Sequence, residues 1–540
     1  MTEVLPLDPL RGMRAVPLTR NGAGPARVAL VGGGPTTLYT LQRLIESDVP
    51  LDIHVFEKDG HIGPGMPYRE DINHPQMLAN IAGRELPPLV DSLHDWLSGC
   101  DADMLAAMKI AKEDIGPEEF YPRLVLGKYF TAQVAALVAR GRARGHDITL
   151  RTRHRVLDLT PGRAIGLDWD SPAGHGSATF DHVVVATGHR WDAQAPHAKV
   201  PMVSPWPADG LRRFIGKDVA ILGTSLTAID AAVALAGFHG AFIEEDAGVS
   251  WEPNGPIDGF RITMMSRKGL LPPADWYYHL PLPELDHFSE AAAADEVAKG
   301  RSGLLNRCIA LLAKDLATID RGRADDLRLT DLDGLADRFF HERLQADPWE
   351  ATRADLAVAE KDRTARKADR WRTALLRAHE VLEEVVPQMS EDDRETLHRE
   401  LKPVFTDCYA SIPHRSIRRM LALKEAGVLD LLRLGKSYEM VPAGSGIEVS
   451  HPGGALRVAG VIDARGQQSV DWSGMFPGLA KVDGVSFDPA TYAVSLPEKC
   501  EGTLSFVAIP ALLPTDPFVQ GLERARDLGH AAASRILGSA

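Results

Sequence analysis

The stretch "RVALVGGGPTTLYTLQRL", residues 27–44, decides the fold of this chain. Residues 28–31 form an apolar run, which is typical of a parallel strand buried on both faces. Three glycines follow, and "LYTLQRLIE" then places apolar residues at helical spacing. Such glycines permit a tight turn and let the backbone approach a pyrophosphate at the start of the helix. The pattern therefore predicts the strand, turn and helix of a dinucleotide-binding domain.

The glycine turn follows the dinucleotide-binding fingerprint with one departure. Gly32 and Gly34 occupy the first two positions of GxGxxG, but Thr37 replaces the third glycine, from which we expect looser packing of helix on strand. The next expected strand, "LDIHVFE", ends at Glu57, whose carboxylate would accept hydrogen bonds from ribose hydroxyls. The alternative is a glycine turn in another kind of α/β protein, with Glu57 a solvated strand end. The expected cofactor contacts here are Gly32, Gly34, Pro35, Thr36 and Glu57.

The stretch "GKDVAILGTSLTAIDAAVALA", residues 216–236, repeats this pattern. Gly223 makes the turn, and the following stretch, "FRITMMSRKGLLPP", is expected to be a strand that ends in the hydroxyl of Ser266 and the cations of Arg267 and Lys268. These groups would bind the 2′-phosphate that Glu57 would repel, which favours NADPH over NADH. The alternative is a basic strand end on the surface. The expected contacts are Gly223, Ser225, Leu226, Thr227, Ser266, Arg267 and Lys268.

Two nucleotide sites of opposite charge preference predict two cofactors, FAD and NADPH, with hydride passing from the nicotinamide to the flavin. The formal net charge of −14 argues against a nucleic-acid partner. No apolar run is long enough to span a membrane, and the N-terminus lacks the pattern of a secretory signal. The four cysteines form no CxxC pair, which argues against a dithiol centre or a metal site and suits the reducing cytoplasm.

Several further segments resemble the FAD/NAD(P)-binding family of class B, N-hydroxylating-like flavoprotein monooxygenases. They include "HVFEKDGHIGPGMPY", "MLANIAGRELP", "FYPRLVLGKYF", "VVVATGH" and "VIDARGQ". The resemblance implies that the chain after the second strand lies along the flavin, that an "ATG" segment crosses between two domains, and that "VIDARG" returns to the first. The residues so implied as cofactor contacts are Gly65, Met77, Leu78, Asn80, Arg123, Ala186, Thr187, Gly188, Asp463 and Gly466.

The resemblance assigns no catalytic residue, but it places Asn80, His414 and Arg415 near the active cleft. The alternatives are plain core packing for Met77 and a helix cap or core histidine for His414. In the family pattern a closing helix also points its N-terminus at the flavin, where it would stabilise the anionic reduced form. Here Pro517 suits the first position of that helix.

We expect an α/β fold with two Rossmann-like doubly wound domains, the second inserted in the first, plus a helical insert. The expected ranges are an FAD domain over 1–200 and 461–540, an NADPH domain over 201–280 with its return over 401–460, and the insert over 281–400. The insert caps the flavin cleft or forms an oligomer surface.

The resemblance implies a monooxygenase that acts through a flavin C4a-(hydro)peroxide, with O₂ and a small amine or amino-acid-like substrate. One alternative is an NADPH-dependent flavin reductase or dehydrogenase without oxygen transfer. A second alternative is a non-catalytic flavin-binding interaction protein. The expected NADPH site, the absence of a CxxC dithiol and the resemblance favour the monooxygenase, and no residue is assigned the oxygen-transfer step.

Overall fold

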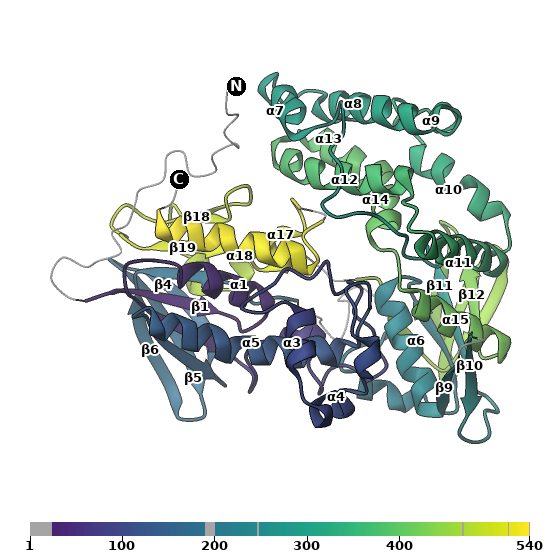
Figure 1. Ribbon diagram of the computed structural model, residues 1–540, viewed down its shortest axis with the longest axis horizontal. Helices are drawn as coiled ribbons and strands as arrows, with labels where there is room; N and C mark the ends of the chain where they lie inside the picture. The colour runs from purple at the N-terminus through teal and green to yellow at the C-terminus, as the bar shows by residue number, and fades with distance from the viewer. Residues whose placement is uncertain (1–23, 190–199, 246–247, 467–468, 517, 539–540) are drawn as a thin grey trace. The chain divides into compact units, whose positions relative to one another are not determined.

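The computed structural model describes residues 24–189, 200–245, 248–466, 469–516 and 518–538 (Figure 1). The chain divides into two compact units. Unit 1 holds the described residues within 1–75, 81–190 and 467–540, and unit 2 holds those within 76–80 and 191–466. Unit 2 is therefore inserted in the sequence of unit 1.

Unit 1 is built on a seven-stranded sheet in the order β17-β18-β19-β7-β1-β2-β3. Five consecutive strands of this sheet run parallel, namely β19, β7, β1, β2 and β3. The strands β18 and β17 continue the sheet beyond β19 in antiparallel pairing. All four residues of β7 are buried, as expected of a strand covered on both faces. The strands are β1 (Ala26–Val31), β2 (Leu51–Glu57), β3 (Asp147–Thr152), β7 (His182–Val185), β17 (Ser486–Asp488), β18 (Ala493–Ser495) and β19 (Thr503–Phe506).

Helices and an antiparallel three-stranded sheet complete unit 1. Gly529 lets the last helix approach the first, since a Cβ there would lie 2.7 Å from the carbonyl oxygen of Thr36. The small sheet consists of β4 (Arg155–Pro161), β5 (Ile165–Ser171) and β6 (Gly174–Phe180). The helices are α1 (Pro35–Leu44), α2 (Gly65–Tyr68), α3 (Leu93–Gly99), α4 (Ala102–Met108), α5 (Arg123–Ala143), α16 (Pro477–Ala480), α17 (Ile509–Leu512) and α18 (Leu522–Leu537).

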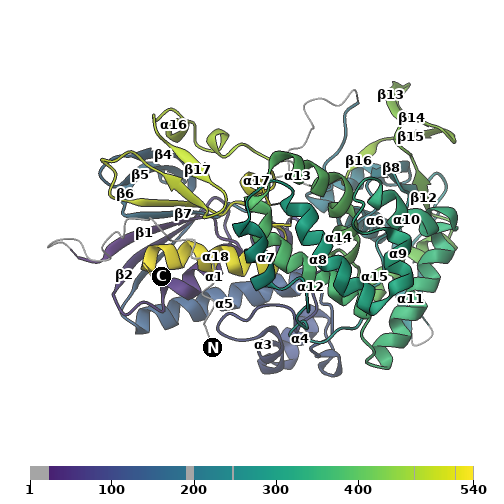
Figure 2. The same cartoon turned by 90° about the horizontal axis from the view of Figure 1, so that it is seen from above.

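Unit 2 repeats this topology with a shorter sheet. Its parallel order β12-β11-β8-β16 corresponds strand for strand to β3-β2-β1-β7. Its own antiparallel sheet β13-β14-β15 corresponds to β4-β5-β6, and Figure 2 labels the strands of both small sheets. The elements are β8 (Asp218–Leu222), α6 (Leu226–His239), β9 (Gly240–Glu245), β10 (Gly248–Pro253), β11 (Arg261–Ser266), α15 (His414–Glu425), β12 (Leu429–Arg433), β13 (Glu439–Ala443), β14 (Gly446–His451), β15 (Gly454–Val458) and β16 (Val461–Asp463).

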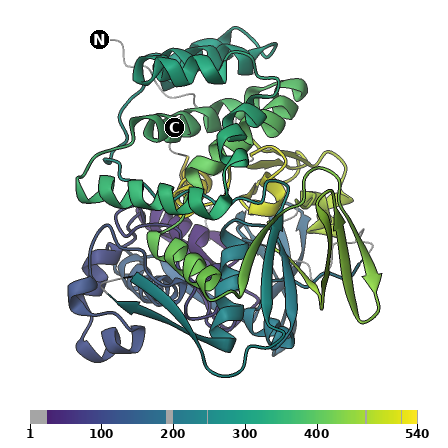
Figure 3. The same ribbon diagram turned by 90° about the vertical axis from the view of Figure 1, so that its right-hand side faces the viewer.

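A helical segment separates β11 from β12, and Figure 3 shows its teal and green helices stacked in layers. Five of these helices begin with a Ser or Asp side chain that accepts a backbone N–H of the first turn, which stabilises a helix start by about 1 kcal/mol. The helices are α7 (Glu290–Ala298), α8 (Leu304–Ile319), α9 (Arg321–Leu327), α10 (Leu335–Gln345), α11 (Pro348–Thr364), α12 (Arg370–Val385), α13 (Glu391–Thr396), a π-helix (Leu397–Leu401) and α14 (Lys402–Tyr409).

The fold confirms the expected pair of Rossmann-like domains with a helical insert and differs from the sequence prediction at the last helix. That helix begins at Leu522 after Gly521, whose φ of +130° ends the preceding loop, so it does not begin near residue 517. Pro517 lies outside the described residues. Among the described helices, none combines the length and apolarity needed to cross a bilayer.

Candidate functional site

The first glycine turn lies between the ends of β1 and β7. Gly32 has a φ of +113°, and a Cβ there would lie 2.2 Å from the carbonyl oxygen of Ala186 at the end of β7. Glycine is therefore the residue that fits this turn. The next residue, Gly33, donates its N–H to Glu57 Oε2 at 2.8 Å, while Asp59 N–H donates to Glu57 Oε1 at 2.9 Å. Burial raises the pKa of Glu57, and these two hydrogen bonds oppose that rise.

The third fingerprint position, Thr37, is tightly packed. Its side chain is 1% exposed, and its hydroxyl donates a 2.8 Å hydrogen bond to the carbonyl oxygen of Gly32. The expectation of looser helix packing was wrong, because the threonine hydroxyl ties the helix to the turn.

The loop after β2 folds back onto the glycine turn. Gly63 N–H donates to the carbonyl oxygen of Gly33 at 2.7 Å, and a Cβ on Gly65 would lie 3.2 Å from the Cα of Gly34. Gly34 precedes α1, and Pro35 at the helix start has no N–H to donate. The first-turn N–H groups of Thr36 and Thr37 are therefore the donors that this helix start would offer to an anion.

Three polar side chains of unit 1 gather near the start of α5. The positive charge of Arg123, the first residue of α5, acts on both Tyr68 and His189. Burial raises the pKa of Tyr68 to about 12. Burial, and then the charge of Arg123, lower the pKa of His189, so this imidazole is neutral at pH 7. Sequence reasoning identified Arg123 but missed Tyr68 and His189, although His189 ends the quoted "VVVATGH".

The remaining contacts expected in unit 1 lie beside the turn. Ala186 supplies the carbonyl above Gly32, and it is followed by Thr187 and by Gly188 with a φ of +66°. No distance ties Thr187 or Gly188 to another expected contact, so their cofactor roles stay predictions.

Residues 76–80 belong to unit 2 and were expected beside the flavin. Met77 is 1% exposed and lies in the apolar core of unit 2, which favours the core-packing alternative for it. Leu78 is also buried. The carboxamide oxygen of Asn80 is buried and has no hydrogen-bond donor among the described residues. Arg419 donates to the backbone oxygen of Gln76 at 2.7 Å and so ties this segment to α15.

The second glycine turn copies the first. Gly223 has a φ of +138°, and a Cβ there would lie 2.7 Å from the carbonyl oxygen of Ala464, which follows β16 as Ala186 follows β7. Ser225 precedes α6 at the N-cap position without a capping hydrogen bond from its side chain, and the first residues of the helix are Leu226 and Thr227. Ser266 takes the place of Glu57, since its hydroxyl accepts hydrogen bonds from Thr224 Oγ1 at 3.1 Å and from Gly269 N–H at 2.9 Å.

The two cations after Ser266 lie in different surroundings. The Arg267 side chain is exposed. The Lys268 ammonium lies 3.3 Å from the ring centroid of Phe340 on α10, so the helical segment covers it. Burial lowers the pKa of Lys268 to about 8, and the nearby carboxylate of Asp407 opposes this. Sequence reasoning missed Phe340, because nothing in its local pattern marks a contact with β11.

The candidates in the second half of the chain make structural contacts. The Nε2 atom of His414 is 2.7 Å from the backbone oxygen of Asp275, and Arg415 pairs with Glu244 at 3.1 Å. For His414 this favours the alternative of a structural histidine. Asp463 pairs with Arg465 at 2.7 Å, and Gly466 has a φ of +103°. The described residues contain no group of three or more side chains arranged to hold a metal ion.

Comparison with known proteins gives the family. Residues 29–190 match the family model described as FAD-NAD(P)-binding, and residues 289–409 match the YdhS-like middle domain. The chain is 34% identical over 523 residues to "Uncharacterized protein YdhS" of Escherichia coli K12, covering 95% of this chain and 97% of that protein. We call the helical segment 289–409 the middle domain below.

Among solved structures, the reduced form of ornithine hydroxylase PvdA from Pseudomonas aeruginosa has a TM-score of 0.50 and 14% identity, over 95% of this chain and 99% of that one. The ornithine N-hydroxylase KtzI from Kutzneria sp. 744 has a TM-score of 0.48 and 13% identity, over 95% and 98%. At this identity the likeness to PvdA shows a shared fold. The chain belongs to the YdhS family of FAD/NAD(P)-binding oxidoreductases.

Proposed function

We propose that the protein is an FAD- and NADPH-dependent monooxygenase that transfers one oxygen atom from O₂ to a small amine or amino-acid-like substrate. The observation that carries this proposal is a pair of glycine turns of the same build whose strand ends bear opposite charge. Glu57 ends β2 in unit 1, and Arg267 and Lys268 follow β11 in unit 2. One chain thus provides one turn suited to FAD and another suited to a 2′-phosphate.

The residues of unit 1 fit the adenosine and pyrophosphate of FAD. Two backbone N–H groups occupy one lone pair on each oxygen of Glu57. A carboxylate offers about four acceptor positions, so two remain for the ribose hydroxyls. Gly34 and Gly65 lie against each other at the start of α1, and neither carries a side chain that would keep a pyrophosphate from the backbone there. When bound, the flavin supplies hydride acceptance and reaction with oxygen.

The residues of unit 2 fit NADPH. The exposed guanidinium of Arg267 is available to a 2′-phosphate, and Lys268 adds a second cation beside it. The hydroxyl of Ser266 already accepts two hydrogen bonds, so its O–H is the donor that it can offer.

The cysteines support oxygen transfer over disulfide reduction. All four are free, and burial raises the pKa of each thiol, to about 12 for Cys308. A disulfide reductase needs a reactive thiolate, whose pKa is lowered. The fold shared with PvdA, an ornithine hydroxylase, supports an amine-bearing substrate.

The test is a balance of electrons in the purified yellow protein. NADPH loss, O₂ uptake, H₂O₂ release and hydroxylated product are measured with a panel of diamines and basic amino acids. A monooxygenase gives one product per NADPH with at least one member of the panel. Release of one H₂O₂ per NADPH with every substrate would establish the reductase alternative instead. Bound flavin with no NADPH loss would indicate the interaction protein.

A further inference from the structure

One helix of the middle domain, α10, is tied to the chain that follows the strands β11 and β12. The Nη2 atom of Arg343 on α10 donates to the backbone oxygen of Leu271 at 2.8 Å, and the side chain of Arg433 at the end of β12 donates to the backbone oxygen of Leu344 at 3.3 Å. Ligands of such parallel sheets bind at the carboxyl ends of the strands. The middle domain therefore borders the edge of the sheet where a nucleotide would lie.

Phe340 is the residue of α10 that contacts this edge, and its ring is held in place. The side chain is 2% exposed and packs edge-to-face with Phe339, with 5.0 Å between the ring centroids. The first turn of α10 is fixed as well, because the buried carboxylate of Glu400 accepts the N–H of Ala336 at 3.2 Å. A ring fixed in this way can fix the position of a group that lies on its face.

The group on the face of Phe340 is the ammonium of Lys268, 3.3 Å from the ring centroid, where the attraction between a cation and a ring acts. No carboxylate of the described residues pairs with this half-buried ammonium. The carboxylate of Asp407, which acts on Lys268, is already bonded to Arg343 at 2.8 and 2.7 Å. A cation that is partly buried without a carboxylate is costly unless an anion pairs with it. Lys268 is thus placed to receive an anionic group of a ligand.

We propose that the middle domain completes the 2′-phosphate end of the NADPH site, with Phe340 as the positioning residue that holds the ammonium of Lys268 beside Arg267. The inference rests on the proposed function, because it takes the edge after β11 as the place of the 2′-phosphate. An ammonium has three N–H groups, so contact with one ring face leaves donors for a phosphate. Because the ring already orders the lysine side chain, binding the phosphate costs less conformational entropy.

The test compares two fragments that differ only in the 2′-phosphate, namely 2′,5′-ADP and 5′-AMP. Their dissociation constants are measured by titration calorimetry on the flavin-loaded full chain. Phe340 is replaced by a ring-trifluorinated phenylalanine, which nearly keeps the shape of the ring and weakens the negative charge of its face. The dissociation constant of 2′,5′-ADP should rise about three- to tenfold, and that of 5′-AMP should change by less than about twofold. Phe340→Leu should give the same difference between the two fragments.

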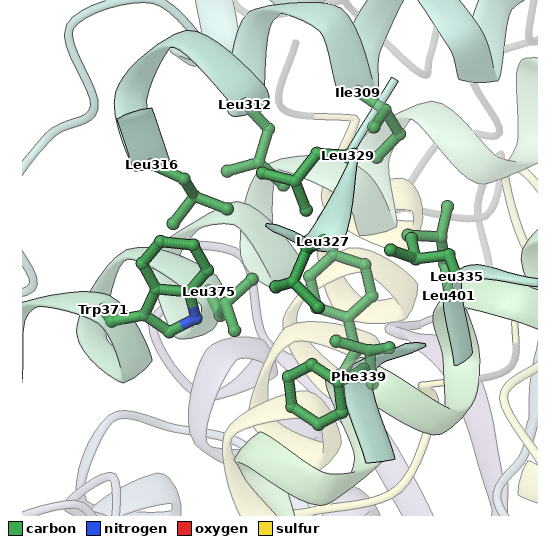
Figure 4. Close-up of a pocket in the computed structure, with 12 residues that line it drawn as sticks. Ile309, Leu312, Leu316, Leu327, Leu329, Leu335, Phe339, Trp371, Leu375 and Leu401 are labelled. Atoms are coloured by element: carbon green, nitrogen blue, oxygen red, sulfur yellow. The ribbon is translucent and has the colours of Figure 1, made fainter. Parts of the chain in front are cut away.

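Phe339→Leu is the matched control, since Phe339 is the neighbour of Phe340 in α10. Figure 4 shows the Phe339 ring among apolar side chains of the middle domain, including Leu327. This variant loses a ring of the same size from the same helix, and it should leave the affinity for both fragments unchanged. Weaker binding of 2′,5′-ADP by Phe339→Leu, equal to that caused by the fluorinated ring, would show a general effect of helix packing and overturn the role of Phe340.

Arg267→Ala tells whether the 2′-phosphate lies at this edge of the sheet. If this variant binds 2′,5′-ADP more weakly and the fluorinated protein does not, the role of Phe340 is overturned while the NADPH site stands. If neither protein binds 2′,5′-ADP more weakly than the parent, the position of the 2′-phosphate is wrong and the inference fails with it. Tighter binding of 2′,5′-ADP by the fluorinated protein would show that Phe340 withholds Lys268 from the phosphate, which also overturns the proposal.

Discussion

Replacing Gly32 and Gly34 separately by alanine should show that one glycine of the first turn is needed for folding and the other for flavin binding. At Gly32 the added methyl meets the carbonyl oxygen of Ala186 at 2.2 Å, in a backbone conformation with φ of +113°. At Gly34 the backbone has a φ of −91°, and the methyl meets Gly65 Cα at 3.5 Å, an ordinary contact. We therefore expect the first substitution to destabilise the fold and the second to weaken flavin binding alone.

The magnitudes follow from these contacts. A non-glycine residue held at such a φ costs about 1–3 kcal/mol, and the overlap with fixed backbone adds about 1–3 kcal/mol. Gly32→Ala should therefore lose roughly 2–6 kcal/mol of unfolding free energy, or about 4–20 °C in the melting temperature. Gly34→Ala should stay within about 0.5 kcal/mol of the parent, because it adds no strain.

Melting is followed by circular dichroism on flavin-free protein, because bound flavin would add its own stabilisation. Gly174→Ala is the control for backbone strain, since Gly174 has a φ of +107° with no atom within 4 Å of its added Cβ. The loss in Gly32→Ala beyond the loss in this control measures the overlap with Ala186. Equal losses in the two variants would refute the overlap, and full flavin retention by Gly34→Ala would refute the pyrophosphate position.

Three further outcomes are expected. Arg267→Ala should raise the dissociation constant of NADPH about tenfold or more and leave that of NADH nearly unchanged, as titration of both would show; equal effects would contradict the 2′-phosphate contact. NADPH binding should weaken as the pH rises through about 8, where Lys268 loses its proton, and Lys268→Met should remove this dependence; the same dependence for NADH would count against it. Burial lowers the pKa of His182 to about 4, so the unfolded chain binds a proton between pH 6.5 and 4 that the folded chain does not. As the pH falls over that range, the free energy of unfolding should fall by about 3 kcal/mol, and by less in His182→Gln; denaturant unfolding measures both. The same dependence of unfolding free energy on pH in the variant would show that His182 is not the group responsible.

The sequence was sufficient to predict the features that depend on short stretches of chain. A buried apolar run, a glycine turn and helical spacing lie within some twenty residues at each nucleotide turn, so local sequence carried both. The helical insert was visible for the same reason. Glu57 and Arg267 were predicted as cofactor contacts because the first ends a strand and the second directly follows one, at the edge of the sheet where such ligands bind.

Contacts between distant parts of the chain escaped prediction. Lys268 meets Phe340 across 72 residues, and Tyr68, Arg123 and His189 come together from three separate segments. The packing of Thr37 was mispredicted for a different reason. The fingerprint specifies a small residue at this position, and it does not include a hydroxyl that donates a hydrogen bond to the turn. Sequence spacing reports neighbours along an element, whereas these roles depend on which elements pack together.

On the proposed assignment, the two turns use one backbone design to select cofactors of different charge. In unit 1 the side chain that accepts the turn's N–H is a carboxylate, so closing the turn with Glu57 also fixes a negative charge at the strand end. In unit 2 the neutral hydroxyl of Ser266 meets the turn through the side-chain hydroxyl of Thr224, and the next two positions carry the cations Arg267 and Lys268. In unit 1 a single residue, Glu57, both contacts the turn and carries the charge, so changing the cofactor preference there also changes the contact with the turn. In unit 2 Ser266 contacts the turn while Arg267 and Lys268 carry the charge, so the charge can be changed without changing that contact.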